Sequence, residues 1–231
     1  ENIAGTGISD KKLKDLLQGE RGSEVNVKVK RRNSKRLKSF DIIRSVIPIS
    51  SIEAAYKTDD IAYIKLNRFS STTIDDFKKA TDTLITEETD KLILDLRNNS
   101  GGYLYVSVKL LEFFLERNTE VLTTKGYHQA EKKYYTQISG KYPEIKLVVL
   151  INEHSASASE IFAGAIQDYD RGIVVGRRSF GKGLVQKPIY LVDGSMLRLT
   201  IAKYYTPSGR NIQKPYDDGV DEYKDEVDNR L

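Results

Sequence analysis

Short apolar runs alternate with segments of helical periodicity along most of this 231-residue chain. Four runs have the length and composition of buried strands, at residues 61–69, 91–96, 147–151 and 173–175. Three segments between them have helical spacing, at residues 72–85, 103–117 and 157–170. Strands that alternate with helices favour a largely parallel sheet covered by helices. The alternation therefore predicts a mixed α/β fold, followed by a hairpin at residues 186–204 around Asp193 and Gly194.

The two ends of the chain differ in composition from this alternating region. Residues 1–45 contain a short helical pattern and two strand patterns, which flank a basic cluster at residues 28–38. This segment has few apolar residues, so we expect the end of a small domain with a solvated basic hairpin. Residues 216–231 carry seven acidic side chains and little apolar surface. We therefore predict a small domain at 1–45, a core at 46–215 and an acidic tail at 216–231.

The composition excludes several classes of site. The chain has no cysteine, which excludes disulfides, a cysteine nucleophile and cysteine-ligated metals, and which suits an oxidising compartment. The two histidines, His128 and His154, are too scattered to predict a metal site. A net charge of +4 is too small to indicate a nucleic-acid partner. No apolar run reaches the ~18 residues that a membrane span needs.

Ser157 lies between two alanines, where a predicted strand passes into a predicted helix. The first N–H groups of a helix are unpaired and carry partial positive charge, so an oxyanion formed beside Ser157 can accept the N–H of Ala158. The small neighbours leave the hydroxyl accessible to a large substrate. A second interpretation is that Ser155, Ser157 and Ser159 only cap the helix, with Glu160 as capping-box partner. Position alone does not decide between a nucleophile and a cap.

Gly101 and Gly102 end the motif DLRNNSGG, which leads from a predicted strand into a helix. Paired glycines let backbone N–H groups face a ligand, so either glycine can supply a second donor to an oxyanion. Losing one such donor typically costs ~2.7–4 kcal/mol of transition-state stabilisation. The alternative is a tight turn without a chemical role.

Lys182 stands between Gly181 and Gly183, and Gln186 follows four residues later. A lysine activates a serine hydroxyl only when it is neutral. Burial between the glycines can lower the pKa of Lys182 from ~10.4 to near 7, at a cost of roughly 4–5 kcal/mol. Gln186 can accept a hydrogen bond from the amine and hold its direction. Taken alone, however, a lysine is far more often an exposed surface residue.

Two other motifs overlap these segments. Residues 176–182 match the P-loop spacing GxxxxGK, but Gly183 stands where Ser or Thr should bind magnesium, and a strand pattern follows instead of a helix. Nucleotide binding is therefore not expected. A triad of Ser157, His154 and Asp168 is not supported either, because no GxSxG elbow surrounds the serine.

From about residue 8 to residue 214 the chain resembles the C-terminal processing, or tail-specific, serine peptidases. The resemblance rests on four motifs: DLRNNSGG at 95–102, SASASE at 155–160, SFGKGLVQ at 179–186 and YYTPSGR at 204–210. It implies a serine endopeptidase that cleaves proteins near their C-termini and needs no cofactor. It also assigns roles to individual residues: Ser157 is the nucleophile, Lys182 the general base, Gln186 its orienting partner, Gly101 or Gly102 together with Ala158 the oxyanion donors, and Asp168 and Arg97 supporting residues.

The resemblance further implies a ClpP/crotonase-like core, preceded at 1–45 by the later part of a PDZ domain. Its setting would be the bacterial cell envelope or periplasm, with the signal segment outside this chain and with substrates that expose their C-termini. A membrane-associated setting and a homo-oligomer are both compatible with it. The chain departs from the family in having His154 in place of a usual glycine, and in lacking the glycine-rich PDZ loop. The alternative hypothesis is a catalytically inactive peptide-binding module on the same fold.

Overall fold

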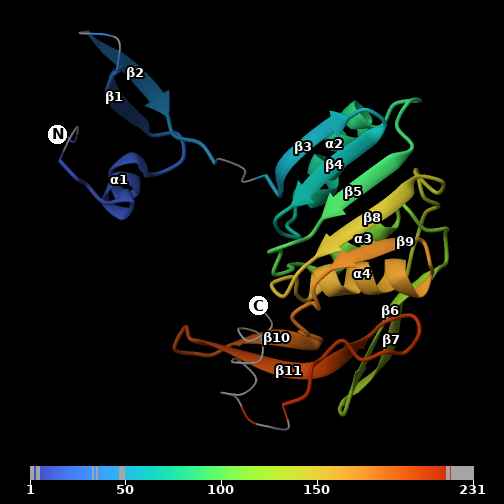
Figure 1. Ribbon diagram of the computed structural model, residues 1–231. Coiled ribbons are helices and arrows are strands. Elements are labelled where there is room, and N and C mark those ends of the chain that lie inside the picture. Colours follow the sequence, from blue (N-terminus) through green and yellow to red (C-terminus); the bar gives the residue numbers. More distant parts are fainter. Residues whose placement is uncertain are drawn as a thin grey trace. The chain divides into compact units, whose positions relative to one another are not determined.

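The computed structural model describes residues 3, 6–32, 34, 36–46, 50–216 and 219 (Figure 1). The chain divides into two compact units, Glu1–Ile49 and Ser50–Leu231, which are considered separately. Most of the acidic segment predicted at 216–231 lies outside the described residues. In the part of the chain that is described, no helix is long and apolar enough to cross a membrane.

The first unit has the helix and the hairpin that the sequence predicts. Its elements are α1 (Asp10–Leu17), β1 (Glu24–Lys30) and β2 (Leu37–Ile43). The hydroxyl of Ser9 accepts the N–H of Lys12 at 3.3 Å and so caps α1. The two strands are antiparallel, with Val27 opposite Phe40, but no residue of α1 is buried. A two-stranded hairpin with so little burial is marginally stable by itself.

The second unit is built around a five-stranded sheet in the order β3-β4-β5-β8-β9. The strands are β3 (Ile52–Thr58), β4 (Ile61–Leu66), β5 (Lys91–Asp95), β8 (Lys146–Ile151) and β9 (Gly172–Gly176). All neighbours are parallel except β3, which is antiparallel to β4. Asp95 lies opposite Leu150, so the segments that follow β5 and β8 leave the sheet at the same edge. Ligands bind at this carboxyl edge in many open α/β sheets.

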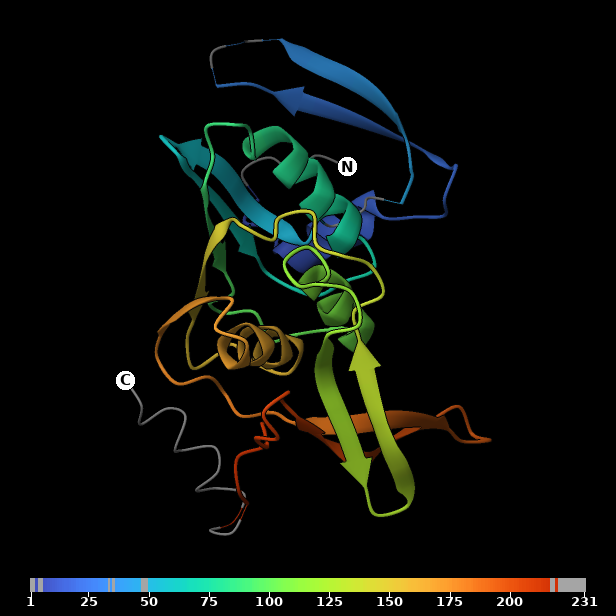
Figure 2. The same cartoon turned by 90° about the vertical axis from the view of Figure 1, so that its right-hand side faces the viewer.

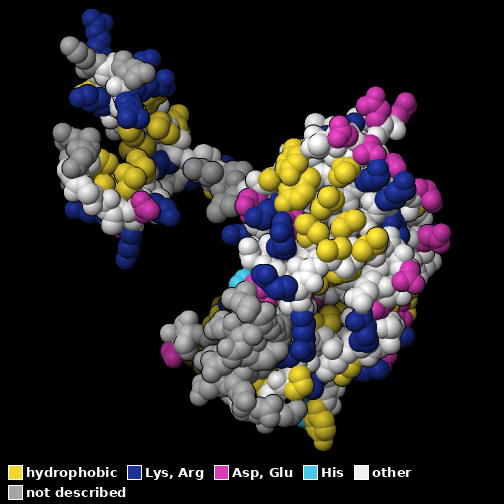
Figure 3. Space-filling view, viewed as in Figure 1, with side chains coloured by type: hydrophobic (Ala, Val, Ile, Leu, Met, Phe, Trp, Pro, Cys, Tyr) yellow, Lys and Arg dark blue, Asp and Glu magenta, His cyan; other side chains and the backbone are white. Residues whose placement is uncertain are grey.

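Three helices cover one face of this sheet (Figures 1 and 2). They are α2 (Thr73–Leu84), α3 (Leu104–Leu111) and α4 (Ala158–Asp168). In the core beneath them Phe114 packs edge-to-face on Phe77 and on Phe162, with ring centroids 6.1 and 5.9 Å apart. Among the described residues no helix covers the opposite face of the sheet, and hydrophobic side chains lie exposed over its strands (Figure 3). On these strands Tyr56 is 51% exposed and Ile173 is 66% exposed.

A second, four-stranded sheet in the order β10-β11-β6-β7 packs beside α4. Its strands are β6 (Glu120–Gly126), β7 (Gln129–Tyr135), β10 (Leu184–Tyr190) and β11 (Met196–Tyr205). Leu122, Ile161 and Tyr204 form a small apolar cluster that attaches this sheet to the helix. The β10–β11 hairpin is the one predicted around Asp193 and Gly194.

The structure differs from the sequence expectations in a few elements. The helix expected to reach residue 117 ends at Leu111, and the strand expected at 61–69 ends at Leu66. The strands β3, β6 and β7 were not predicted at all. The mixed α/β class is confirmed, because parallel strands alternate with helices through the second unit.

Candidate active site

The three serines of the SASAS segment differ in what their hydroxyls contact. The hydroxyl of Ser155 donates to the carbonyl of Leu96 at 2.8 Å, and that of Ser159 donates to the carbonyl of Asn99 at 2.8 Å. Both residues are fully buried, whereas Ser157 is partly exposed. Ser157 therefore carries the one accessible hydroxyl among these three serines.

Ser157 lies at the N-cap of α4 in an unusual backbone conformation, with φ 55° and ψ −110°. A non-glycine residue in such a region stores strain, which is frequently found at functional sites. The N–H of Ser157 donates to Oε2 of Glu160 at 2.8 Å, which is the return half of a capping box. Capping and chemistry are therefore not alternatives here, because Ser157 caps the helix and is still partly exposed.

Gly101 lies directly against Ser157. A Cβ atom at Gly101 would stand 2.9 Å from the Cβ of Ser157 and 2.6 Å from the carbonyl oxygen of Ala156, at a φ of +98°. The N–H of Gly101 is already used, because it donates to Oδ1 of Asn99 at 2.9 Å. Of the two glycines predicted as oxyanion donors, Gly102 is therefore the better candidate.

Gly102 is fixed by the chain segment that follows β4. The carbonyl of Phe69 accepts the N–H of Tyr103 at 2.9 Å, and the N–H of Phe69 donates to the carbonyl of Gly101 at 2.9 Å. A Cβ atom at Gly102 would stand only 2.1 Å from the carbonyl oxygen of Phe69, so a side chain cannot be accommodated there. These contacts hold the backbone of both glycines close to the start of α4.

The carboxylate of Glu160 joins the serine to the lysine loop. Its Oε2 accepts the N–H of Lys182 at 2.9 Å as well as that of Ser157. Its Oε1 accepts the N–H of Gly181 at 2.6 Å and the hydroxyl of Ser179 at 2.7 Å. Burial raises the pKa of Glu160, while these four hydrogen bonds act in the opposite direction. The backbones of Ser157 and Lys182 are thus separated by a single carboxylate oxygen.

The side chain of Lys182 is exposed, contrary to the burial expected from its flanking glycines. Gly181 and Gly183 are themselves buried. The N–H of Gly183 donates to Oε1 of Gln213 at 3.0 Å, and the chain bends so that the lysine between the glycines faces outward. Gln186 is also exposed, and no hydrogen bond joins it to Lys182 among the described residues. The structure brings the backbone of Lys182 to the serine without engaging its amine.

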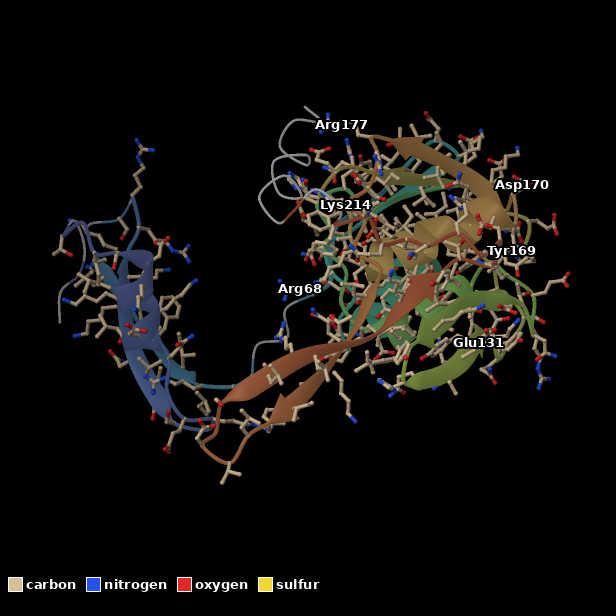
Figure 4. All side chains as sticks on the ribbon, turned by 90° about the horizontal axis from the view of Figure 1, so that it is seen from below. Arg68, Glu131, Tyr169, Asp170, Arg177 and Lys214 are labelled. Carbon is tan, nitrogen blue, oxygen red and sulfur yellow. The ribbon has the colours of Figure 1, made fainter. Side chains whose placement is uncertain are left out.

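Asp168 lies at the far end of α4 from Ser157. Burial acts to raise its pKa, but hydrogen bonds from Thr206, Ser208 and Arg210 lower the pKa of Asp168 below its usual value. Figure 4 shows Tyr169, the next residue, on the opposite side of the second unit from Arg177. Asp168 therefore fixes the turn that follows β11, and it does not approach the serine.

Arg97 binds the buried carboxylate of Asp95 through both Nε and Nη2, at 3.0 and 2.6 Å. The hydroxyl of Tyr63 donates to the same carboxylate at 2.6 Å. Burial raises the pKa of Asp95, but these hydrogen bonds outweigh it and lower the pKa overall. Burial and the neighbouring carboxylate raise the pKa of Tyr63 to about 12. This group fixes the end of β5, from which the DLRNNSGG motif departs.

The competing motifs have other surroundings in the described part of the chain than a triad or a P-loop would need. His154 is exposed, and its Nε2 lies 3.7 Å from Oε1 of Glu153, so the imidazole faces this carboxylate. The segment after the P-loop-like sequence is the strand β10 and not a helix. In the described part of the chain, no three His, Asp or Glu side chains are grouped to hold a metal ion.

A cavity of about 370 Å³ lies along α4. Glu160, Gly181 and Lys214 are among its lining residues, whereas Ser157 is not. The cavity therefore borders the lysine loop without being lined by Ser157.

The family model and the similar proteins all point to the same family. The model of peptidase family S41 matches residues 60–222. The carboxy-terminal processing protease CtpB of Bacillus subtilis is 36% identical over 219 residues, which cover 93% of this chain and 45% of that protein. The carboxy-terminal-processing protease of Bartonella bacilliformis is 36% identical over 220 residues, which cover 91% and 50%.

A solved structure gives the same result. The photosystem II D1 C-terminal processing protease matches with a TM-score of 0.63 and 31% identity, covering 90% of this chain and 57% of that chain. The chain spans about half the length of the curated relatives that it matches. The matches confirm the resemblance that the four motifs predicted. This chain belongs to peptidase family S41.

Proposed function

We propose that this chain is the catalytic part of a serine endopeptidase that cleaves protein substrates near their C-termini. The observation that carries the proposal is the accessible hydroxyl of Ser157, which lies at the start of α4 and against the backbone of Gly101. Membership of family S41, and relatives named as carboxy-terminal processing proteases, support the same activity.

In the proposed reaction the Oγ of Ser157 attacks the carbonyl carbon of the scissile bond, and the amine of Lys182 takes the hydroxyl proton. The N–H groups of Gly102 and Ala158 stabilise the oxyanion that forms, each contributing about 2.7–4 kcal/mol. Lys182 then returns the proton to the leaving amine as the peptide bond breaks. Water attacks the resulting ester and releases the second product.

Lys182 must turn from its exposed position toward the serine for this reaction. Glu160 already holds the backbone of Lys182 beside that of Ser157, and we propose that a change of side-chain rotamer then brings the amine to the hydroxyl. We further propose that Gln186 accepts a hydrogen bond from the amine in that arrangement.

The finer assignments are part of the same proposal. They comprise a ClpP/crotonase-like core, a partial PDZ domain at 1–45, substrates with exposed C-termini and an exported protein of the bacterial cell envelope. The four sequence motifs and the bacterial sources of the relatives support them. Asp168 and Arg97 act in this scheme by fixing loops, as their hydrogen bonds suggest.

Digestion of an unfolded protein such as β-casein, with products identified by mass spectrometry, tests the proposal. The wild-type chain should release C-terminal fragments, and Ser157→Ala should release none while keeping its fold. Ser155→Ala and Ser159→Ala are matched controls: each should remain active but lose about 1–3 kcal/mol of unfolding free energy, since a buried carbonyl loses its donor. Continued cleavage by Ser157→Ala would show that another group is the nucleophile.

The exposed position of Lys182 favours one alternative, an inactive peptide-binding module on the same fold. The two hypotheses predict different results at alkaline pH, where a free lysine becomes neutral and can act as a base. The peptidase should then cleave the substrate, whereas the binding module should not. A wild-type chain that binds the unfolded substrate but leaves it intact at every pH tested would favour the binding module.

A further inference from the structure

Two tyrosines lie exposed immediately after the glycine pair. Tyr103 is 56% exposed and Tyr105 is 55% exposed, although both are large aromatic residues. Their rings stack on each other, with centroids 5.5 Å apart and an interplanar angle of 28°. Exposed aromatic surface of this kind commonly marks a place where a ligand or partner binds.

Two sets of contacts place this pair beside Ser157. Tyr103 is two residues after Gly101, which lies against the Cβ of Ser157. Ser107, one helical turn farther along α3, donates from its hydroxyl to the carbonyl of Ala158 at 2.9 Å. One turn of helix advances about 5.4 Å, so the backbone of Tyr103 lies within a short distance of the start of α4.

Two contacts hold the pair at this position. The N–H of Tyr103 donates to the carbonyl of Phe69 at 2.9 Å, which fixes the backbone where the glycines meet the helix. Each tyrosine ring is restrained by the other through their stacking. A tyrosine has only two side-chain torsions, so it offers a large contact area at a low entropic cost.

We propose that Tyr103 and Tyr105 form a subsite that receives an apolar side chain of the polypeptide substrate, close to the bond that Ser157 cleaves. This inference rests on the proposed peptidase function and names the substrate feature that the site prefers. An apolar side chain that lies on the rings leaves water and covers ring surface that is otherwise exposed. A glycine covers little of that surface, and a carboxylate would lose hydration without gaining a partner from the rings.

The test begins with the bonds that the wild-type chain cleaves in β-casein. Two peptides are then made around one such bond, with Leu or Gly at the flanking position that the digest shows to be most often apolar. The double variant Tyr103→Ala/Tyr105→Ala should lose up to about tenfold in kcat/KM on the Leu peptide, mainly through KM. Its kcat/KM on the Gly peptide should stay unchanged.

Matched variants keep the outcome interpretable. Tyr103→Phe/Tyr105→Phe retains both rings and should behave as the wild type, which also controls for folding. Tyr127→Ala removes a tyrosine that is 96% exposed at the turn between β6 and β7, and it should leave both peptides unaffected. Equal losses on the Leu and Gly peptides, or no loss on either, would overturn the subsite while leaving the peptidase function intact. A wild-type chain that cleaves nothing would overturn both.

Discussion

At the scale of single residues, Glu160 connects the two parts of the candidate site. It accepts hydrogen bonds from the backbone of Ser157 on one side and from Ser179, Gly181 and Lys182 on the other. A carboxylate can satisfy four donors because both of its oxygens accept. An amide cannot, because one of the two positions becomes a donor.

Glu160→Gln should therefore leave two buried donors facing an NH₂ group. We expect a loss of at least about 2 kcal/mol of unfolding free energy, measured by urea denaturation. Hydrolysis of β-casein should fall by about 10²-fold, because Glu160 no longer fixes the position of the lysine loop relative to the serine. Glu88→Gln, at a side chain that is 89% exposed, should change neither quantity. Unchanged hydrolysis in Glu160→Gln would mean that the loop keeps its place without the carboxylate.

The sequence predicts some of these residues and not others, for a physical reason. Ser157, Gly101 and Gly102 belong to local patterns in which a strand passes into a helix, and such patterns depend on neighbours in the chain. The bond between Glu160 and Lys182 joins positions 22 residues apart, so it depends on tertiary packing. The exposure of Lys182 was also missed, because buried flanking glycines do not determine which way the side chain between them turns.

At the scale of elements, the turn from β5 into α3 must approach α4 without a side chain. Gly101→Ala adds the cost of a positive φ, about 1–2 kcal/mol, and a clash with Ala156 and Ala158 that costs a further 1–3 kcal/mol or so. Gly209→Ala is the matched control, because Gly209 has a φ of +83° but no atom within 4 Å of the added Cβ. Urea denaturation should show a larger loss of unfolding free energy for Gly101→Ala than for Gly209→Ala. Of the two variants, only Gly101→Ala should stop hydrolysing the substrate. Equal losses would mean that backbone strain alone explains the glycine.

A bidentate ion pair joins the end of β9 to the turn after β8. Arg177 donates to both oxygens of Glu153, at 2.6 and 2.8 Å, and these hydrogen bonds lower the pKa of Glu153 to about 2. A carboxylate with a lowered pKa stabilises the fold above its unfolded pKa of about 4.3, and this stabilisation is lost as the pH falls. The pair therefore contributes most at neutral pH.

Arg177→Ala should lower the unfolding free energy at pH 7, and the difference from the wild type should shrink as the pH falls from about 4.3 toward the folded pKa of about 2. Urea denaturation at a series of pH values measures this difference. Arg198→Ala, at an exposed arginine on β11, should show no such dependence. A difference that stays constant down to acid pH would rule out Glu153 as its source.

The elements that sequence patterns predict are those with a buried face. β5 and β8 are continuous apolar runs because the sheet is covered by helices on one face and partly buried on the other. β7 has mostly exposed side chains, and its residues give no alternating apolar pattern. It is a strand because it pairs with β6 in a hairpin at the edge of the second sheet, and apolar periodicity does not report such pairing between strands.

At the scale of the whole molecule, the buried apolar core belongs to one unit. Every buried hydrophobic side chain among the described residues lies within Ser50–Leu231. The first unit has exposed apolar side chains on its hairpin, among them Phe40 and Ile42. Removing residues 1–45 should therefore leave the second unit folded, which makes that deletion usable as a control.

We predict that the first unit binds C-terminal peptides weakly or not at all. A PDZ groove takes up a peptide as an added strand while backbone N–H groups receive its terminal carboxylate. Residues 1–45 supply a helix and a hairpin, but the sequence shows no glycine-rich carboxylate loop among them. The basic residues 28–38 can still attract an acidic peptide, but salt at 0.1 M largely screens exposed charges that are more than about 10 Å apart.

Fluorescence polarisation with an apolar peptide and its amidated twin, at low and high salt, separates capture of the carboxylate from this charge attraction. A preference for the free carboxylate that survives high salt and disappears when residues 1–45 are deleted would show that this unit does capture C-termini.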